Sequence, residues 1–251
     1  FMNREGLKTE FLNNSELGKF ERLPIKNDAS YRQYERILKA NGESLIFMDA
    51  PPEKEKVQPF IQVSDFLINN DISAPKIFKS DIPKGFLLLE DFGNDSYSNI
   101  LAGKSIVSEE LDEELMYEKA MDALIHLHKI PTNKIALNLY DESSLIKESM
   151  RFIDFYVSIL NGEKLNKKMQ EEYVLILKHL ISSVKIMGNV VVLRDYHVDN
   201  LMWLEDRAGH RKVGMLDFQD AIIGSPVYDI VSLLEDARRD VSPELREKMI
   251  K

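Results

Sequence analysis

The sequence predicts an α+β fold of two lobes, with a five-stranded antiparallel sheet in the first lobe and mainly helices in the second. Short apolar runs between turn residues dominate the chain up to residue 92, which is typical of strands. From residue 93 onward, apolar residues fall at helical spacing in longer segments. A chain of 251 residues with 44% apolar content can bury a core in two lobes. We therefore expect an N-terminal lobe over residues 1–92 and a C-terminal lobe over residues 93–251.

The N-terminal lobe is expected to hold five strands and one main helix. Asn41-Gly42 separates two of the apolar runs, and Asn-Gly is the strongest short hairpin signal. Residues 55–70 carry apolar side chains at helical spacing, and a shorter helix is expected over residues 8–15. The predicted strands cover residues 20–24, 31–38, 44–48, 74–79 and 85–92.

The C-terminal lobe is expected to be built from helices with recognisable ends. Ser108 and Asn166 are placed as N-caps, Gly162 closes another helix, and Ser242 precedes a Pro that suits a first helical turn. The predicted helices cover residues 109–129, 142–161, 167–187, 226 to about 239, and 243 onward.

Charge and composition exclude several classes of function. A net charge of −9 argues against non-specific binding to nucleic acid, which needs a basic surface. The absence of Cys excludes disulfides, Cys-based zinc sites and thiol catalysis. No apolar run reaches the roughly 18 residues of a membrane span, and the start lacks the pattern of a secretion signal. A cytoplasmic location without membrane association is the resulting expectation.

The most informative stretch runs from residue 190 to residue 220 and reads V-V-V-L-R-D-Y-H-V-D-N-L-M-W-L, a polar turn, then K-V-G-M-L-D-F-Q-D. Its last two apolar runs flank a turn composition and predict a hairpin. The hairpin would place Asn200 at the start of one strand opposite Asp217 at the end of the other, with Asp195 in the loop before them. Hard oxygen ligands in small number suit Mg²⁺ that also binds substrate phosphates.

This stretch carries a family resemblance. R-D-x-x-x-x-N followed by a hairpin and D-F-x resembles the catalytic core of kinases. L-R-D-Y-H-V-D-N-L-M-W-L, with L-D-F-Q-D-A-I-I-G-S-P-V-Y-D-I-V-S-L-L-E-D-A-R-R-D-V, resembles the aminoglycoside phosphotransferase-like kinases, most narrowly the bacterial anomeric kinases of N-acetylmuramate and N-acetylglucosamine. The resemblance implies a two-lobe protein-kinase-like fold. It also implies further helices after Lys251, so that the substrate lobe here would be incomplete.

The same resemblance implies a chemistry and a set of roles. The reaction would be ATP- and Mg²⁺-dependent transfer to a small-molecule hydroxyl, most narrowly the anomeric hydroxyl of the two amino sugars in cell-wall recycling. Asp195 would be the base, and Asn200 and Asp217 would hold Mg²⁺ at the ATP phosphates. The main chain of Glu90 and Phe92, in the segment that joins the lobes, would bond the adenine.

Two departures from the kinase pattern concern the phosphates. The third strand, S-L-I-F-M-D over residues 44–49, lacks the Lys that pairs the phosphates. Arg32 or Arg36 on the neighbouring strand would replace it, since Arg grips phosphate with two parallel bonds. The turn over residues 28–30 has no glycine, and its amides with the Ser30 hydroxyl would face a phosphate.

The acceptor is expected near the loop and the helix that follows it. Asp229 resembles an acid that braces the catalytic loop through backbone hydrogen bonds. A charged run on a helix is usually a solvated face, so the acceptor residues are the least specific prediction. The candidates are His197, Gln219, Asp220, Glu235 and Arg238.

Two alternative functions stay open at this stage. The acceptor could instead be an aminoglycoside, choline, or another amino sugar or alcohol. The missing Lys also fits a nucleotide-binding pseudokinase that acts as a regulatory module, although Asp195, Asn200 and Asp217 are all present. The sequence predicts neither the oligomeric state nor a regulator.

Overall fold

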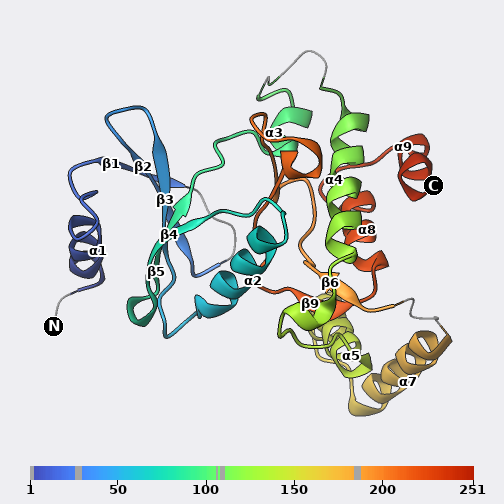
Figure 1. Ribbon diagram of the computed structural model, residues 1–251. Helices are drawn as coiled ribbons and strands as arrows, with labels where there is room; N and C mark the ends of the chain where they lie inside the picture. Colours follow the sequence, from blue (N-terminus) through green and yellow to red (C-terminus); the bar gives the residue numbers. More distant parts are fainter. Residues whose placement is uncertain (1–2, 26–29, 106, 108–110, 184–187) are drawn as a thin grey trace.

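A computed structural model describes residues 3–25, 30–105, 107, 111–183 and 188–251, and it has two lobes (Figure 1). The first lobe contains an antiparallel sheet with the strand order β1-β2-β3-β5-β4. The predicted five-stranded sheet is confirmed, with strand ends that differ from the prediction by a few residues. The strands are β1 Glu21–Ile25, β2 Gln33–Leu38, β3 Ser44–Asp49, β4 Ile77–Asp81 and β5 Phe86–Glu90.

One helix covers each face of this sheet (Figure 1). Helix α1 (Arg4–Asn13) packs Phe11 against Phe47 and Phe86, with ring centroids 5.4–5.8 Å apart. On the same face the buried Lys8 meets the Asp49 carboxylate at 2.9 Å, so its charge is paired. The face of the sheet that α1 covers therefore has a small apolar core, separate from the main core.

The opposite face of the sheet belongs to the main core. Helix α2 (Gln58–Asn69) buries Phe60, Val63 and Leu67 against Leu87 and Leu89 of β5. The same cluster of buried apolar residues continues into the helices and strands of the second lobe. The two lobes consequently share one core on this side of the sheet.

The second lobe is mainly helical, as predicted. The predicted cap Asn166 is present, because its Oδ1 accepts from Met169 N at 3.0 Å, and Ser242 Oγ caps the last helix by accepting from Leu245 N at 3.1 Å. None of the helices in the described ranges is long and apolar enough to cross a membrane. The helices are α3 Tyr97–Leu101, α4 Glu113–His128, α5 Glu142–Arg151, α6 Ser158–Asn161, α7 Lys167–Ser183, α8 Val227–Leu234 and α9 Pro243–Ile250, with a π-helical turn Phe152–Val157 between α5 and α6.

Two helix predictions need correction, and a third cannot be compared over its last residues. α4 begins at Glu113 with Asp112 as its N-cap, four residues later than predicted, and the predicted cap Ser108 lies outside the described residues. The predicted end of α7, residues 184–187, also lies outside them. α8 ends at Leu234 and not near residue 239, because the Asp236 carboxylate accepts the N–H of Arg238 at 3.0 Å and competes with helical bonding.

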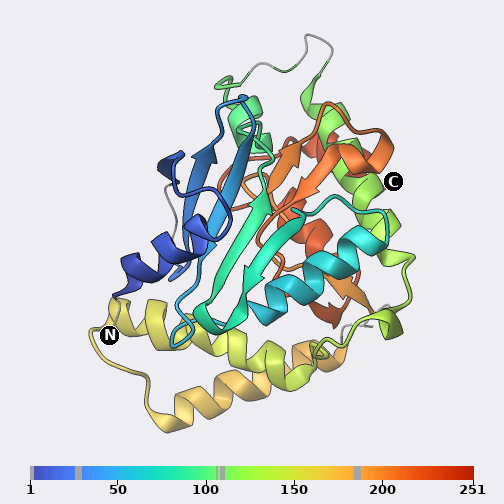
Figure 2. The same ribbon diagram turned by 60° about the vertical axis from the view of Figure 1, so that its left-hand side comes forward.

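Two short pairs of strands support the central stretch. β7 (Leu201–Trp203) pairs with β8 (Val213–Met215), so the predicted hairpin is confirmed. β6 (Val190–Val192) pairs with β9 (Ile222–Gly224), a strand that the sequence did not predict. Figure 2 shows the hairpin, in orange, beside the sheet of the first lobe.

Candidate active site

The loop between β6 and β7 carries Asp195, and hydrogen bonds to a buried acid hold its start in place. The Asp229 carboxylate accepts the N–H groups of Leu193 at 2.7 Å and Arg194 at 2.8 Å, which are the bonds that the sequence predicted. Arg194 has a φ of 74°, a region that side chains other than glycine rarely adopt. Complete burial raises the pKa of Asp229 to about 7, although the two donors oppose the shift. This support fixes the direction in which the loop leaves β6.

Asn200 closes the loop with its side chain. Its Nδ2 donates to the carbonyl oxygen of Asp195 at 3.0 Å and to Nε2 of His197 at 3.2 Å. Because a carbonyl oxygen can only accept, these bonds fix the orientation of the amide. The Oδ1 atom of Asn200, which is the atom able to ligate a metal, takes part in neither bond.

Asp217 follows β8 and lies at the same end of the hairpin as Asn200. The N–H of Leu216 donates to the carbonyl oxygen of Asn200 at 2.9 Å and ties the two strands together there. Asp217 has a φ of 54°, and its Oδ1 accepts from Gln219 Nε2 at 2.9 Å and Arg32 Nη2 at 3.2 Å. The predicted convergence of Asn200 and Asp217 is therefore present in the structure.

The Asp195 carboxylate experiences a negative environment. Desolvation and the nearby carboxylate of Asp217 raise its pKa above the usual range of an aspartate. His197 and Arg194 oppose this shift with positive or ionisable groups. A carboxylate with a raised pKa is a stronger base for a proton that arrives during a reaction.

A cavity of about 440 Å³ lies between the sheet and the hairpin. Ile46 and Leu89 line it from the sheet, while Met202 and Leu216 line it from the hairpin. Such a site, apolar in the middle and polar at one end, suits an aromatic base that carries a charged group. The cavity is lined by all six residues that the sequence nominated for a nucleotide: Ser30, Arg32, Glu90, Phe92, Asn200 and Asp217.

The two arginines that were candidates to replace the absent Lys have different partners, although both line the cavity. Arg36 grips Asp91 with two bonds, of 2.5 Å from Nε and 3.0 Å from Nη2, and also donates to the Gly93 carbonyl at 2.8 Å. Its guanidinium therefore holds the segment that joins the lobes. Arg32, in contrast, reaches Asp217 in the second lobe.

Four of the five acceptor candidates lie around Asn200 and Asp217. His197 is buried and bonds Asn200, and burial with the nearby Arg238 lowers its pKa. Arg238 also pairs with Asp199 at 3.3 Å, next to this loop. The Gln219 amide donates to Asp217 and to Asp220, at 2.9 and 3.2 Å.

Glu235 is the fifth candidate and has different contacts. Its carboxylate pairs with Arg246 of α9 at 3.0 Å. This contact ties α8 to α9 and gives Glu235 a structural partner away from the loop.

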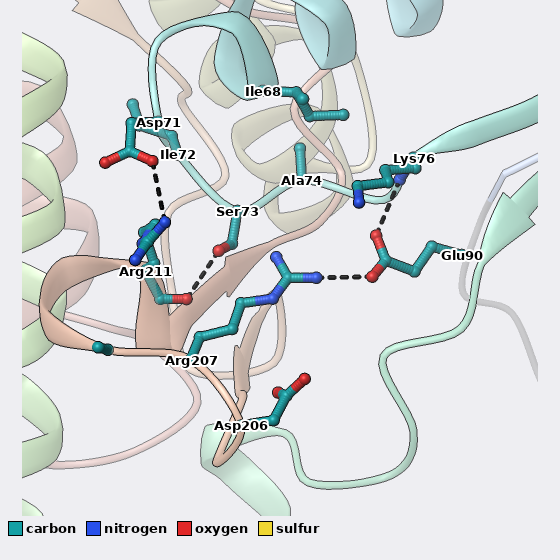
Figure 3. A pocket seen from close by; sticks show the side chains of 11 residues that line it. Ile68, Asp71, Ile72, Ser73, Ala74, Lys76, Glu90, Asp206, Arg207 and Arg211 are labelled. Carbon is teal, nitrogen blue, oxygen red and sulfur yellow. Dashed lines mark hydrogen bonds and ion pairs between the residues drawn. The ribbon is translucent and has the colours of Figure 1, made fainter.

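Sequence reasoning missed a residue that contacts the segment joining the lobes, which contains Glu90 and Phe92 and is called the linker below. Arg207, in the turn between β7 and β8, pairs with the Glu90 carboxylate at 2.6 Å (Figure 3). Its guanidinium also lies 5.0 Å from the centroid of the Phe92 ring. The other oxygen of Glu90 accepts from the N–H of Lys76 at 3.1 Å, beside a second cavity of about 490 Å³. Gly214 lets the Phe92 ring lie on β8, because a Cβ there would approach the ring to 2.8 Å. Since 117 residues separate Arg207 from Glu90, no local pattern could reveal the pair.

Arg207→Ala is expected to weaken nucleotide binding about three- to tenfold, because the linker loses a charge-assisted bond and the packing on Phe92. Isothermal titration with ADP measures the effect. Arg211→Ala is the matched control, because Arg211 lies on the same hairpin connection and its side chain pairs with the exposed Asp71 at 3.3 Å. An equal loss of affinity in both variants would contradict a specific role for Arg207.

Comparisons with known proteins agree with this geometry. A family model described as the phosphotransferase enzyme family matches residues 21–251. The chain belongs to this family. It is 31% identical to an N-acetylmuramate/N-acetylglucosamine kinase of Caulobacter vibrioides, over 96% of this chain and 74% of the relative. It is 36% identical to the protein of the same name from Pseudomonas aeruginosa, over 86% of this chain and 60% of that relative.

Solved structures of family members share the fold. Aminoglycoside phosphotransferase APH(2'')-Ib in its ADP-bound form has a TM-score of 0.67 at 18% identity, over 97% of this chain and 80% of that chain. The macrolide 2'-phosphotransferase MphH from Brachybacterium faecium has a TM-score of 0.65 at 10% identity, also over 97% and 80%. The predicted kinase-like fold and the predicted family are confirmed, and this family consists of small-molecule phosphotransferases.

Proposed function

We propose that the chain transfers the γ-phosphoryl group of ATP, with Mg²⁺, to the anomeric hydroxyl of N-acetylmuramate or N-acetylglucosamine. One observation carries the nucleotide part of this proposal: residues from both lobes, nominated from the sequence, line a single cavity with Asn200 and Asp217 at one end. The names of the curated relatives support the choice of acceptor. In this proposal the protein acts in cell-wall recycling in the cytoplasm.

The residues around Asn200 and Asp217 fit Mg²⁺. Mg²⁺ usually takes one or two protein carboxylates and completes its shell with water and substrate phosphates. Within the described ranges, no three His, Cys, Asp or Glu side chains gather into a ready-made metal cage, which agrees with such an open site. Asn200 Oδ1 and the Asp217 carboxylate would hold the ion, which would neutralise charge on the phosphates.

The linker would hold the adenine. The N–H of Glu90 already donates to the Lys76 carbonyl at 2.8 Å, so we assign the Glu90 carbonyl and the Phe92 N–H to the edge of the base. Leu89 and Met202, from opposite sides of the cavity, would contact its faces. We retain residue 92 as the boundary between a nucleotide-binding lobe and a substrate lobe.

Asp195 would position the acceptor hydroxyl and accept its proton as the phosphoryl group is transferred. Phosphoryl transfer demands positioning and charge stabilisation more than covalent work by the protein. The bonds of Asp229 and Asn200 to the loop provide that positioning. His197, Gln219, Asp220 and Arg238 are proposed to surround the sugar, and Glu235 is the weakest of the earlier candidates because of its contact with Arg246.

An acceptor panel tests this function. ADP release is measured with N-acetylmuramate, N-acetylglucosamine, an aminoglycoside and choline, each with and without Mg²⁺. We expect Mg²⁺-dependent turnover with the two amino sugars and loss of their reducing ends. The methyl glycoside of N-acetylglucosamine is the matched control, because it differs only in a blocked anomeric oxygen and should be inert.

Each contrary result has a defined meaning. Turnover of the methyl glycoside would contradict the anomeric position. Turnover only with an aminoglycoside or choline would show that the acceptor is that compound and not an amino sugar. Nucleotide binding without turnover of any acceptor would favour the pseudokinase.

A further inference from the structure

Arg32 bridges the two lobes at the charged end of the cavity. Its Nε pairs with Glu55 at 2.9 Å, and its Nη2 pairs with Asp217 at 3.2 Å. Only 12% of the Arg32 side chain is exposed. Glu55 lies in the segment before α2, whereas Asp217 follows β8 in the second lobe. The guanidinium is therefore held between a carboxylate of each lobe.

Glu55 fixes Arg32 together with the residues before it. One oxygen of the Glu55 carboxylate meets Arg32 Nε, and the other accepts from Ser30 Oγ at 3.1 Å and from Tyr31 N at 3.4 Å. Ser30 Oγ in turn accepts from the backbone N–H of Arg32 at 3.1 Å. The Glu55 carboxylate therefore holds the Arg32 guanidinium by a charge-assisted bond and holds the two preceding residues by hydrogen bonds.

The contact between Arg32 and Asp217 occupies an oxygen of a proposed metal ligand. Asp217 lies close to Asp220, because Gln219 Nε2 donates to both carboxylates, at 2.9 and 3.2 Å, and the Asp217 carboxylate also acts on Asp195 electrostatically. Three acids without a counter-cation repel one another. Arg32 supplies that cation, yet a metal ion on the same carboxylate would compete with it.

We propose that Arg32 is a placeholder cation, which neutralises Asp217 in the empty site and moves its contact to the nucleotide phosphates when Mg·ATP binds. Glu55 is the positioning residue that keeps the guanidinium at the site in both states. The proposal rests on the proposed function, because it assumes that the cavity takes a nucleotide with its metal. It also explains how the chain works without the Lys of the third strand: the cation comes from the residue just before β2, and its acid comes from the segment before α2.

The proposal predicts effects of opposite sign on two ligands. In Arg32→Gln, Mn²⁺ alone should bind at least about twofold more tightly, because a competing cation is gone. The same variant should bind a non-hydrolysable ATP analogue with Mg²⁺ about tenfold more weakly, because a charge-assisted phosphate contact is lost. Electron paramagnetic resonance measures free Mn²⁺, and isothermal titration measures the nucleotide.

Two further variants separate the effect of the position of the Arg32 guanidinium from the effect of its charge. Glu55→Gln should weaken the nucleotide about three- to tenfold and leave Mn²⁺ within about twofold, since the cation stays but loses its anchor. Arg32→Lys should recover part of the nucleotide affinity, since it restores the charge without the fork geometry. Arg22→Gln is the matched control, because Arg22 on β1 pairs with Glu5 of α1 and Glu35 of β2. Thermal unfolding checks that each variant is folded.

Weaker Mn²⁺ binding in Arg32→Gln would overturn the placeholder, and unchanged nucleotide binding in Glu55→Gln would overturn the positioning role. If the wild-type chain binds nucleotide but phosphorylates no acceptor, the proposed function fails while the Arg32 inference is still judged by these affinities. If the wild-type chain binds no nucleotide, both are overturned.

Discussion

Asp195→Asn is expected to lower acceptor-dependent turnover by at least about 10², because the amide cannot accept the proton of the attacking hydroxyl. The loop should keep its shape in this variant. Its bonds to Asn200 and Asp229 use the backbone and not the Asp195 side chain. Nucleotide affinity should therefore stay within about threefold of wild type, so that the loss appears in kcat and not in the KM for ATP. Steady-state kinetics and titration with ADP separate the two quantities.

The control for this variant is an acid of similar exposure outside the site. Asp122→Asn on α4 removes a carboxylate that pairs with Lys119 at 2.7 Å, and it should leave kcat unchanged. A kcat within about threefold of wild type in Asp195→Asn would contradict the assignment of the base.

Asp217→Asn is expected to reduce turnover by about 10³, because a metal ion contributes several kcal/mol of charge stabilisation in the transition state. The variant removes one negative charge but keeps a side chain of the same shape with one oxygen. We expect weaker Mn²⁺ binding together with the loss of turnover, and partial recovery of activity at high Mg²⁺. Metal titration in the presence of ADP measures Mn²⁺ binding, and steady-state kinetics over a range of Mg²⁺ concentrations measures turnover.

Asp206→Asn provides the comparison within the same hairpin. Asp206 lies in the turn at the end remote from Asn200, beside the second cavity. Its loss should change neither metal affinity nor turnover. If Asp217→Asn retained wild-type Mn²⁺ affinity, Asp217 would not be a metal ligand.

The sequence predicted the elements whose cause is local. Alternating apolar runs and the Asn41-Gly42 turn gave the sheet, and side-chain caps such as Asn166 gave the helix starts. The hairpin that joins Asn200 to Asp217 is local as well, since its turn composition and its two apolar runs are adjacent in the chain. These features depend on residues a few positions apart, which is the range over which periodicity and capping act.

Tertiary structure decided the choices that depend on charges from distant segments. Arg32, just before β2, and Arg36, on β2, look equivalent in the sequence, yet Arg32 pairs with Asp217 and Arg36 pairs with Asp91. Arg32 and Asp217 are 185 residues apart, so only the packing of the lobes brings their charges together. Arg207 was missed for the same reason, because its pair with Glu90 forms only when folding brings the hairpin next to the linker. By itself, then, the sequence determined the family, the fold and the group of Asp195, Asn200 and Asp217. The folded chain determined which cation serves that group, since an ion pair acts only over the few ångströms that folding creates.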